Sequence, residues 1–147
     1  MKAARHAGIL TGLPDAYARG RIIGDYRRIA LYGMDYLIEQ KKEDKRRLGM
    51  KEILDEETIH TLEDLSKQLD FMSQLKGLAL SYGYDISKPA RNAKEAVQWL
   101  YFGYLGAIKE QNGAANSIGR IAEFMDIYIQ RDIEEGILDE VHAQELI

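Results

Sequence analysis

The chain has 147 residues, of which 46% are hydrophobic and 30% are charged, and this is the length and composition of one globular domain. Its 20 lysines and arginines stand against 24 aspartates and glutamates, so the formal net charge of −4 excludes the basic surface of nucleic-acid-binding and membrane-surface proteins. The absence of cysteine excludes disulfides and thiolate metal sites.

The first ten residues carry charges and lack an apolar run of signal-peptide length, so we expect a cytoplasmic protein. Residues 10–13 are a weak strand candidate, and no longer alternating pattern follows. His6, His60 and His142 are isolated in the sequence and show no ligand spacing, so we expect no metal site.

The segment from Leu10 to Gly33 combines arginines, glycines and a Pro-Asp turn ahead of an amphipathic helix. Arg19 and Arg21 flank a glycine that lets the backbone turn sharply, and each guanidinium can grip a carboxylate through two parallel hydrogen bonds. This pattern predicts a carboxylate-binding loop. In the alternative interpretation both arginines are solvated or pair with acids such as Asp15 and Asp25.

Apolar residues at helical spacing predict a first helix from about Ile22 to Lys42 and a second from about Asp55 to Tyr82. Between them the run Lys41–Arg47 is dense in both signs of charge, which is typical of solvated helix ends and linkers. We therefore expect residues from about 40 to 82 to form a helical excursion that faces solvent.

Asn92 is predicted to cap a third helix from about Ala93 to Gln111. This helix is apolar nearly all the way round, which favours burial, and it is too short for a membrane span of roughly 20 apolar residues. Trp99 and the neighbouring tyrosines would suit a base-stacking platform, but core packing is favoured because the sequence has no basic groove.

Asn112–Ala115 follows the third helix, and its glycine and alanines permit close approach of the backbone to a ligand, with a simple helix-ending turn as the alternative. Apolar spacing predicts a fourth helix around Phe124 to Ile129 that closes near Gly136. A short last helix is expected from Asp139 to Leu146, so the chain is predicted to be mainly α.

Several of these segments resemble, in the same order, segments of the pyruvate formate-lyases, which are also called formate acetyltransferases and are glycyl radical enzymes. The resembling stretches are Leu10–Gly33, with its Arg19-Gly-Arg-Ile-Ile-Gly-Asp-Tyr-Arg-Arg28 run, then Tyr82–Leu105, Lys109–Arg120 and Asp126–Asp132. The resemblance spans essentially the whole chain and is loosest from about Gln40 to Leu75. The family's adjacent cysteines and radical glycine have no counterpart here, so we expect an internal fragment of a longer enzyme, or a truncated copy.

The resemblance implies a ten-stranded α/β barrel, of which this chain supplies a helical segment. It also implies conversion of pyruvate and coenzyme A to acetyl-coenzyme A and formate by a glycyl and thiyl radical mechanism, with no cofactor bound by this segment. Arg21 matches the family's substrate-carboxylate arginine, with Arg19 as a second candidate. Ala114 and Ala115 match the small residues that line the pyruvate methyl group.

Two positions depart from the family pattern. Ala18 stands where glycine is expected, and we expect it to stiffen the loop before Arg19. Ala122 and Glu123 stand where the family tends to have hydroxyl side chains, so the exact keto acid that is accepted stays open. Related lyases act on 2-ketobutyrate, and one pocket methylene is worth only about 1 to 3 kcal/mol of discrimination. A non-catalytic helical interaction fragment is the alternative from another class, and a diol dehydratase is disfavoured by the Arg-Gly-Arg run.

Two expectations follow for the isolated chain. It should be inactive, because no side chain can supply the family's sulfur-centred radical. It should also associate as a homo-oligomer, because removal of the surrounding barrel would leave apolar patches on the third helix. Any aromatic left exposed there, such as Trp99, Tyr101, Phe102 or Tyr104, would favour pairing with another copy. The expected partners are pyruvate and the rest of the enzyme, with neither nucleic acid nor membrane.

Overall fold

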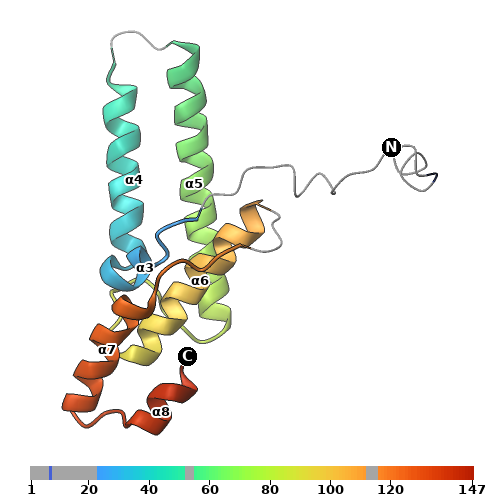
Figure 1. Ribbon diagram of the computed structural model, residues 1–147. Helices are drawn as coiled ribbons and strands as arrows, with labels where there is room; N and C mark the ends of the chain where they lie inside the picture. Colours follow the sequence, from blue (N-terminus) through green and yellow to red (C-terminus); the bar gives the residue numbers. More distant parts are fainter. Residues whose placement is uncertain (1–6, 8–22, 52–54, 112–115) are drawn as a thin grey trace.

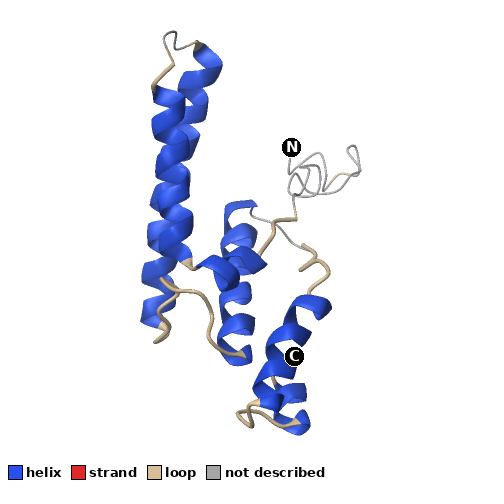
Figure 2. Cartoon of the chain, turned by 90° about the vertical axis from the view of Figure 1, so that its left-hand side faces the viewer, coloured by secondary structure: helices blue, strands red, loops and turns tan. Residues whose placement is uncertain are grey.

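The computed structural model describes residue 7 and residues 23–51, 55–111 and 116–147, and every regular element in these ranges is an α-helix (Figures 1 and 2). The helices in chain order are α3 (Arg27–Tyr32), α4 (Met34–Gly49), α5 (Glu56–Ser81), α6 (Ala93–Gln111), α7 (Ala122–Glu134) and α8 (Glu140–Glu145). The prediction of a mainly α chain is confirmed. The weak strand candidate at residues 10–13 lies outside the described residues.

The predicted helix from Ile22 to Lys42 is wrong in its continuity, because α3 and α4 are separate helices that meet at Gly33. Gly33 has φ 77° and ψ 155°, a conformation that only glycine adopts readily. The loop before α6 packs into this break, where the Met34 N–H donates to the Ile86 carbonyl oxygen at 2.9 Å. α4 also runs to Gly49, so the charged run Lys41–Arg47 forms the largely exposed end of a helix, as predicted.

α4 and α5 form a long antiparallel hairpin that projects from the rest of the molecule (Figure 1). α5 starts after Asp55, whose carboxylate accepts the Thr58 N–H at 2.8 Å, and it ends before Tyr82, so both predicted boundaries are confirmed. Lys76 of α5 forms an ion pair with Asp35 of α4 across the hairpin. Whether the hairpin faces solvent in a longer protein stays a prediction.

α6 lies at the centre of the core, where α3 crosses it (Figure 1). Trp99 and Phe102 are only 4% and 2% exposed, and the Trp99 indole N–H donates to the Lys88 carbonyl oxygen at 2.9 Å. Core packing of Trp99 is therefore confirmed. The loop before α6 covers Trp99 and Phe102 through Tyr84, whereas Tyr101 is 47% exposed. Association of the isolated chain stays a prediction.

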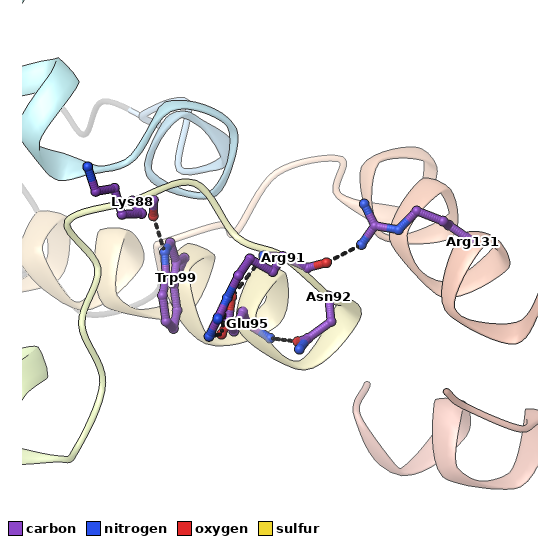
Figure 3. Close-up of polar contacts among 6 residues, drawn as sticks. All are labelled: Lys88, Arg91, Asn92, Glu95, Trp99 and Arg131. Atoms are coloured by element: carbon purple, nitrogen blue, oxygen red, sulfur yellow. Dashed lines mark hydrogen bonds and ion pairs between the residues drawn. The ribbon is translucent and has the colours of Figure 1, made fainter. Parts of the chain in front are cut away.

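The N-terminus of α6 is capped by its own neighbours (Figure 3). As predicted, Asn92 is the cap, since its side-chain oxygen accepts the Glu95 N–H at 2.9 Å. The Glu95 carboxylate in turn accepts the Arg91 backbone N–H at 2.8 Å and the Arg91 guanidinium at 2.6 Å. The Asn92 side chain satisfies an N–H group that the helix start leaves without an intrahelical partner, and the bonds from Arg91 hold the Glu95 carboxylate beside this cap.

A second set of bonds joins this helix start to α7. Asp132 of α7 is 2% exposed, and its carboxylate accepts the Ala93 N–H at 2.6 Å. Arg131 donates to the Arg91 carbonyl oxygen at 2.6 Å, as Figure 3 shows, and to Asp132 at 3.2 Å. The position of α7 is thus fixed by polar bonds across about 40 residues of sequence.

The C-terminal part follows the prediction. α7 ends before Gly136, which has φ 69°, and Asp139 caps α8 by accepting the His142 N–H at 2.8 Å. α7 contributes Phe124 and Tyr128 to the core, with their rings 5.3 Å apart in an edge-on contact.

The α6 cap predicts a pH dependence of stability. Hydrogen bonding by Arg91 lowers the pKa of the Glu95 carboxyl, so the folded state favours the ionised form. A lowered pKa contributes stability that is fully present above about pH 4.3, the ordinary value for glutamate, and is lost as the pH falls through the folded-state pKa. Glu95→Gln should therefore lower the midpoint of urea unfolding at pH 7, and the difference from the parent should vanish in strong acid.

The matched control is Glu134→Gln, an exposed glutamate on α7 that forms no ion pair with the described residues. It should leave the midpoint unchanged at both pH values. A Glu95→Gln deficit that persists in strong acid would mean that side-chain packing, and not the carboxylate, stabilises the helix start.

Candidate functional site

The predicted substrate residues Arg19, Arg21, Ala114 and Ala115 all lie outside the described residues. The structure does describe the chain on the C-terminal side of each pair, from Ile23 onward and from Asn116 onward. The positions of these two flanks can therefore be compared.

Tyr104 of α6 contacts both flanks. Its hydroxyl donates a hydrogen bond to the Asn116 carbonyl oxygen at 2.8 Å. Its ring meets the Tyr26 ring edge-on, with centroids 5.5 Å apart and planes at 81°. One side chain in the middle of α6 thus ties together segments that are 90 residues apart in the sequence.

A glycine of α6 allows α3 to approach this closely. A Cβ at Gly103 would lie 3.4 Å from the Tyr26 carbonyl oxygen and 3.1 Å from the Ile29 side chain, so α3 packs directly on the backbone of α6. Gly119 has φ 81°, and a Cβ there would lie 3.6 Å from the Ile23 side chain. The flank of the arginine pair therefore lies beside the flank of the alanine pair. We call Ile23, Tyr26, Tyr104, Asn116 and Gly119 the junction.

The junction contains buried polar atoms without partners. The Tyr26 hydroxyl and both polar atoms of the Asn116 amide are buried and form no hydrogen bond, and they are the only such side-chain atoms in the part of the chain that the structure describes. Sequence reasoning missed both residues. Their sequence signals are weak, because Asn116 is notable only for following the two alanines and Tyr26 only for belonging to the Arg-Gly-Arg run.

One ion pair lies beside the junction. Asp25, one of the acids considered as a partner for Arg19 and Arg21, forms a two-pronged pair with Arg27 at 2.6 and 3.0 Å. This hydrogen bonding lowers the pKa of Asp25 below its usual value. The two positions that depart from the family pattern, Ala122 and Glu123, are exposed in the first turn of α7.

Two grooves of the described chain lie away from the junction. One lies between α4 and α5 beside the pair of Asp35 and Lys76, and another lies over the acidic start of α5. Among the described residues no three histidine, aspartate or glutamate side chains gather in the way that metal binding requires. None of the helices in these same ranges combines the length and apolar character that crossing a bilayer requires.

A family model and a curated relative are both similar to this chain. The family model described as pyruvate formate lyase-like matches residues 1–147. A curated relative from Haemophilus influenzae, named formate acetyltransferase, is 56% identical in an alignment that covers 97% of this chain and 19% of the relative. The chain thus spans about a fifth of the length of the curated relative that it matches.

Proposed function

Because this chain belongs to the pyruvate formate lyase-like family, we propose that it works as one segment of a formate acetyltransferase and helps to form its pyruvate site. The observation that carries this proposal is the junction, where the flank of the arginine pair meets the flank of the alanine pair. Two segments matched to one substrate by resemblance would then lie on either side of that substrate.

The proposed reaction breaks the bond between the carboxyl carbon and the keto carbon of pyruvate. The acetyl group passes to the sulfur of coenzyme A, and the carboxyl carbon leaves as formate. The radical and thiol groups would come from outside this chain, which contains no cysteine. The contribution of this segment would be to bind and orient the substrate. The proposed location of the enzyme is the cytoplasm.

Arg21 is the proposed carboxylate-binding residue, with Arg19 beside it as the second candidate. A guanidinium matches the two oxygens of a carboxylate with two parallel hydrogen bonds and keeps its charge at any physiological pH. Ala114 and Ala115 would leave room for the methyl group at the other end of pyruvate, since their side chains are the smallest that still exclude water.

Arg21→Lys in the complete enzyme that carries this chain tests the proposal. Lysine keeps the charge but loses the two-pronged geometry, and a lost charge-assisted hydrogen bond costs about 1.5 to 3 kcal/mol. We expect kcat/KM for pyruvate, measured by formate release, to fall by roughly one to two orders of magnitude. The same assay with 2-ketobutyrate in place of pyruvate shows which of the two keto acids has the higher kcat/KM.

The control is Arg28→Lys, an exposed arginine on α3. It should keep the parental kcat/KM. If Arg21→Lys also kept it, Arg21 would be a solvated arginine and the carboxylate-binding role would be wrong. If the enzyme released no formate from either keto acid, the proposed reaction itself would be wrong.

A further inference from the structure

We propose that one face of α5 docks against a part of the longer polypeptide that lies outside these 147 residues. This face is made of Phe71, Leu75, Leu78 and Tyr82, and we call it the outer seam of α5. The inference rests on the proposed function, because it takes this chain to be one segment of a complete formate acetyltransferase. It adds an interaction surface that the resemblance does not assign.

The spacing of the four residues places them on one side of the helix. They occur at positions i, i+4, i+7 and i+11, and apolar side chains with this spacing form a stripe that packs against another element. The side of α5 that faces α4 is already packed, since Leu65 is 8% exposed and Lys76 forms an ion pair with Asp35 of α4. α5 thus has two faces suited to packing, and α4 occupies only one of them.

The outer seam is exposed along most of its length. Phe71, Leu78 and Tyr82 are 56%, 42% and 69% exposed. Single exposed apolar side chains are common on protein surfaces and need no explanation, whereas a contiguous set of large ones marks an interaction surface. The outer seam is such a set, because its members follow one another on one face of one helix.

The outer seam lies where the hairpin joins the core (Figure 1). Leu75 contacts α6, because a Cβ at Gly106 would lie 3.4 Å from the Leu75 side chain. The centroid of the Tyr82 ring lies 6.4 Å from that of the buried Phe102 ring. Toward the tip of the hairpin, α4 carries instead the ion pairs of the charged run Lys41–Arg47. An element that packs on the core beside α6 would therefore cover the outer seam as well.

A segment of the same polypeptide is the occupant that fits this surface. The relative that is 56% identical contains the matched region as only 19% of its length, so most of a protein of that kind lies outside this chain. A stable interface between separate chains buries about 1,200 to 2,000 Å² in total, which is more than four side chains on one helix supply. A tethered segment needs less area, because the covalent connection raises its effective concentration.

Hydroxyl-radical footprinting of the complete enzyme, read by mass spectrometry, tests the inference on the native side chains. Tyr82 is 69% exposed in this chain and Tyr36 of α4 is 50% exposed, so Tyr82 would be oxidised faster if both stayed open. We expect the reverse order, with Tyr82 oxidised several-fold more slowly than Tyr36, because the docked segment covers it. Oxidation of Tyr82 at the rate of Tyr36 or faster would overturn the inference.

A matched pair of variants provides a second measurement. Phe71→Glu places a charge in the outer seam, whereas Ile59→Glu places one on the same helix near the hairpin tip, at a position that is 46% exposed. In the complete enzyme only Phe71→Glu should lower the melting temperature, since a charge buried under the docked segment is costly. Equal melting temperatures for the two variants would mean that nothing covers Phe71.

The footprint also identifies the occupant. The enzyme is diluted until light scattering shows a monomer, and the oxidation of Tyr82 is measured again. Protection that persists in the monomer supports a segment of the same polypeptide, whereas protection that disappears would make the occupant a second copy and the inference wrong. Formate release is measured separately, so an enzyme with a protected seam and no formate release would contradict the proposed function alone.

Discussion

Replacing Gly33 by alanine is expected to destabilise the protein by about 3 to 5 kcal/mol, from two separate causes. The first cause is backbone strain, because Gly33 has φ 77° and ψ 155°, a region that side chains avoid at a cost of about 1 to 3 kcal/mol. The second cause is steric. An alanine Cβ would lie 2.5 Å from the Ser87 carbonyl oxygen and 2.6 Å from the carbonyl carbon of Lys88.

The steric clash involves backbone atoms, so no side-chain rotation can relieve it. The loop before α6 would have to move away from the break between α3 and α4, and it would lose the bonds from the Met34 and Asp35 N–H groups to the Ile86 and Ser87 carbonyl oxygens. The free energy of unfolding, measured by urea or guanidinium titration, is the direct test.

Two control variants separate the causes. Gly83→Ala places alanine at φ 83° with no atom within 4 Å of its Cβ, so it should show the strain alone, about 1 to 3 kcal/mol. Gly49→Ala involves neither a positive φ nor a steric clash, because no atom lies within 4 Å of the added Cβ. It should be neutral or slightly stabilising, since Gly49 lies in α4 and alanine is a better helix former. Equal losses for Gly33→Ala and Gly83→Ala would refute the steric contribution of the loop.

Replacing Asp132 by alanine is expected to cost about 2 to 4 kcal/mol, because it leaves the Ala93 N–H at the start of α6 without its partner. Asp132 is 2% exposed, so water cannot easily take over the lost hydrogen bond, and the removed carboxyl leaves a void. Arg131 is 42% exposed and can turn to solvent when the carboxylate is removed, so the expected loss of stability is smaller than for breaking a fully buried ion pair.

Asp132→Asn refines this prediction. The amide keeps an oxygen acceptor for the Ala93 N–H but loses the charge that strengthens the bonds to Ala93 and Arg131, so its cost should be smaller than that of alanine. Asp126→Ala, at an exposed position of the same helix, should change the free energy of unfolding by no more than about 0.5 kcal/mol. Comparable losses at positions 126 and 132 would mean that α7 is sensitive to any change of charge.

Helix starts were predictable from the sequence where the capping residue lies next to the helix. Asp55, Asn92 and Asp139 each accept the N–H of the residue three positions later, and this local geometry needs no distant part of the chain. The sequence likewise predicted the mainly α content, because helical periodicity is a property of neighbouring residues. The family was identified from the segments that resemble it, and the comparisons confirm it.

The candidate site could be predicted only in part from the sequence. Arg19, Arg21, Ala114 and Ala115 come from the resemblance, and they stay predictions because they lie outside the described residues. Tyr26 and Asn116 enter only through the structure, since their polar atoms are notable for being buried without partners. Burial depends on which segments cover a side chain, and the sequence pattern around these two residues does not specify that.

The sequence by itself determined the family, the helical content and the capped starts of α5, α6 and α8, because each follows from adjacent residues or from a long matched segment. The tertiary structure alone decided the break at Gly33, the bond from Ala93 to Asp132 and the contact of Ile23 with Gly119. The bond from Ala93 to Asp132 joins residues 39 positions apart, and Ile23 and Gly119 are still farther apart in the sequence. The break at Gly33 depends on the loop before α6, which packs into it from a distant part of the sequence. Such contacts are set by how whole helices pack, because the free energy that orders them comes from the shared core around α6.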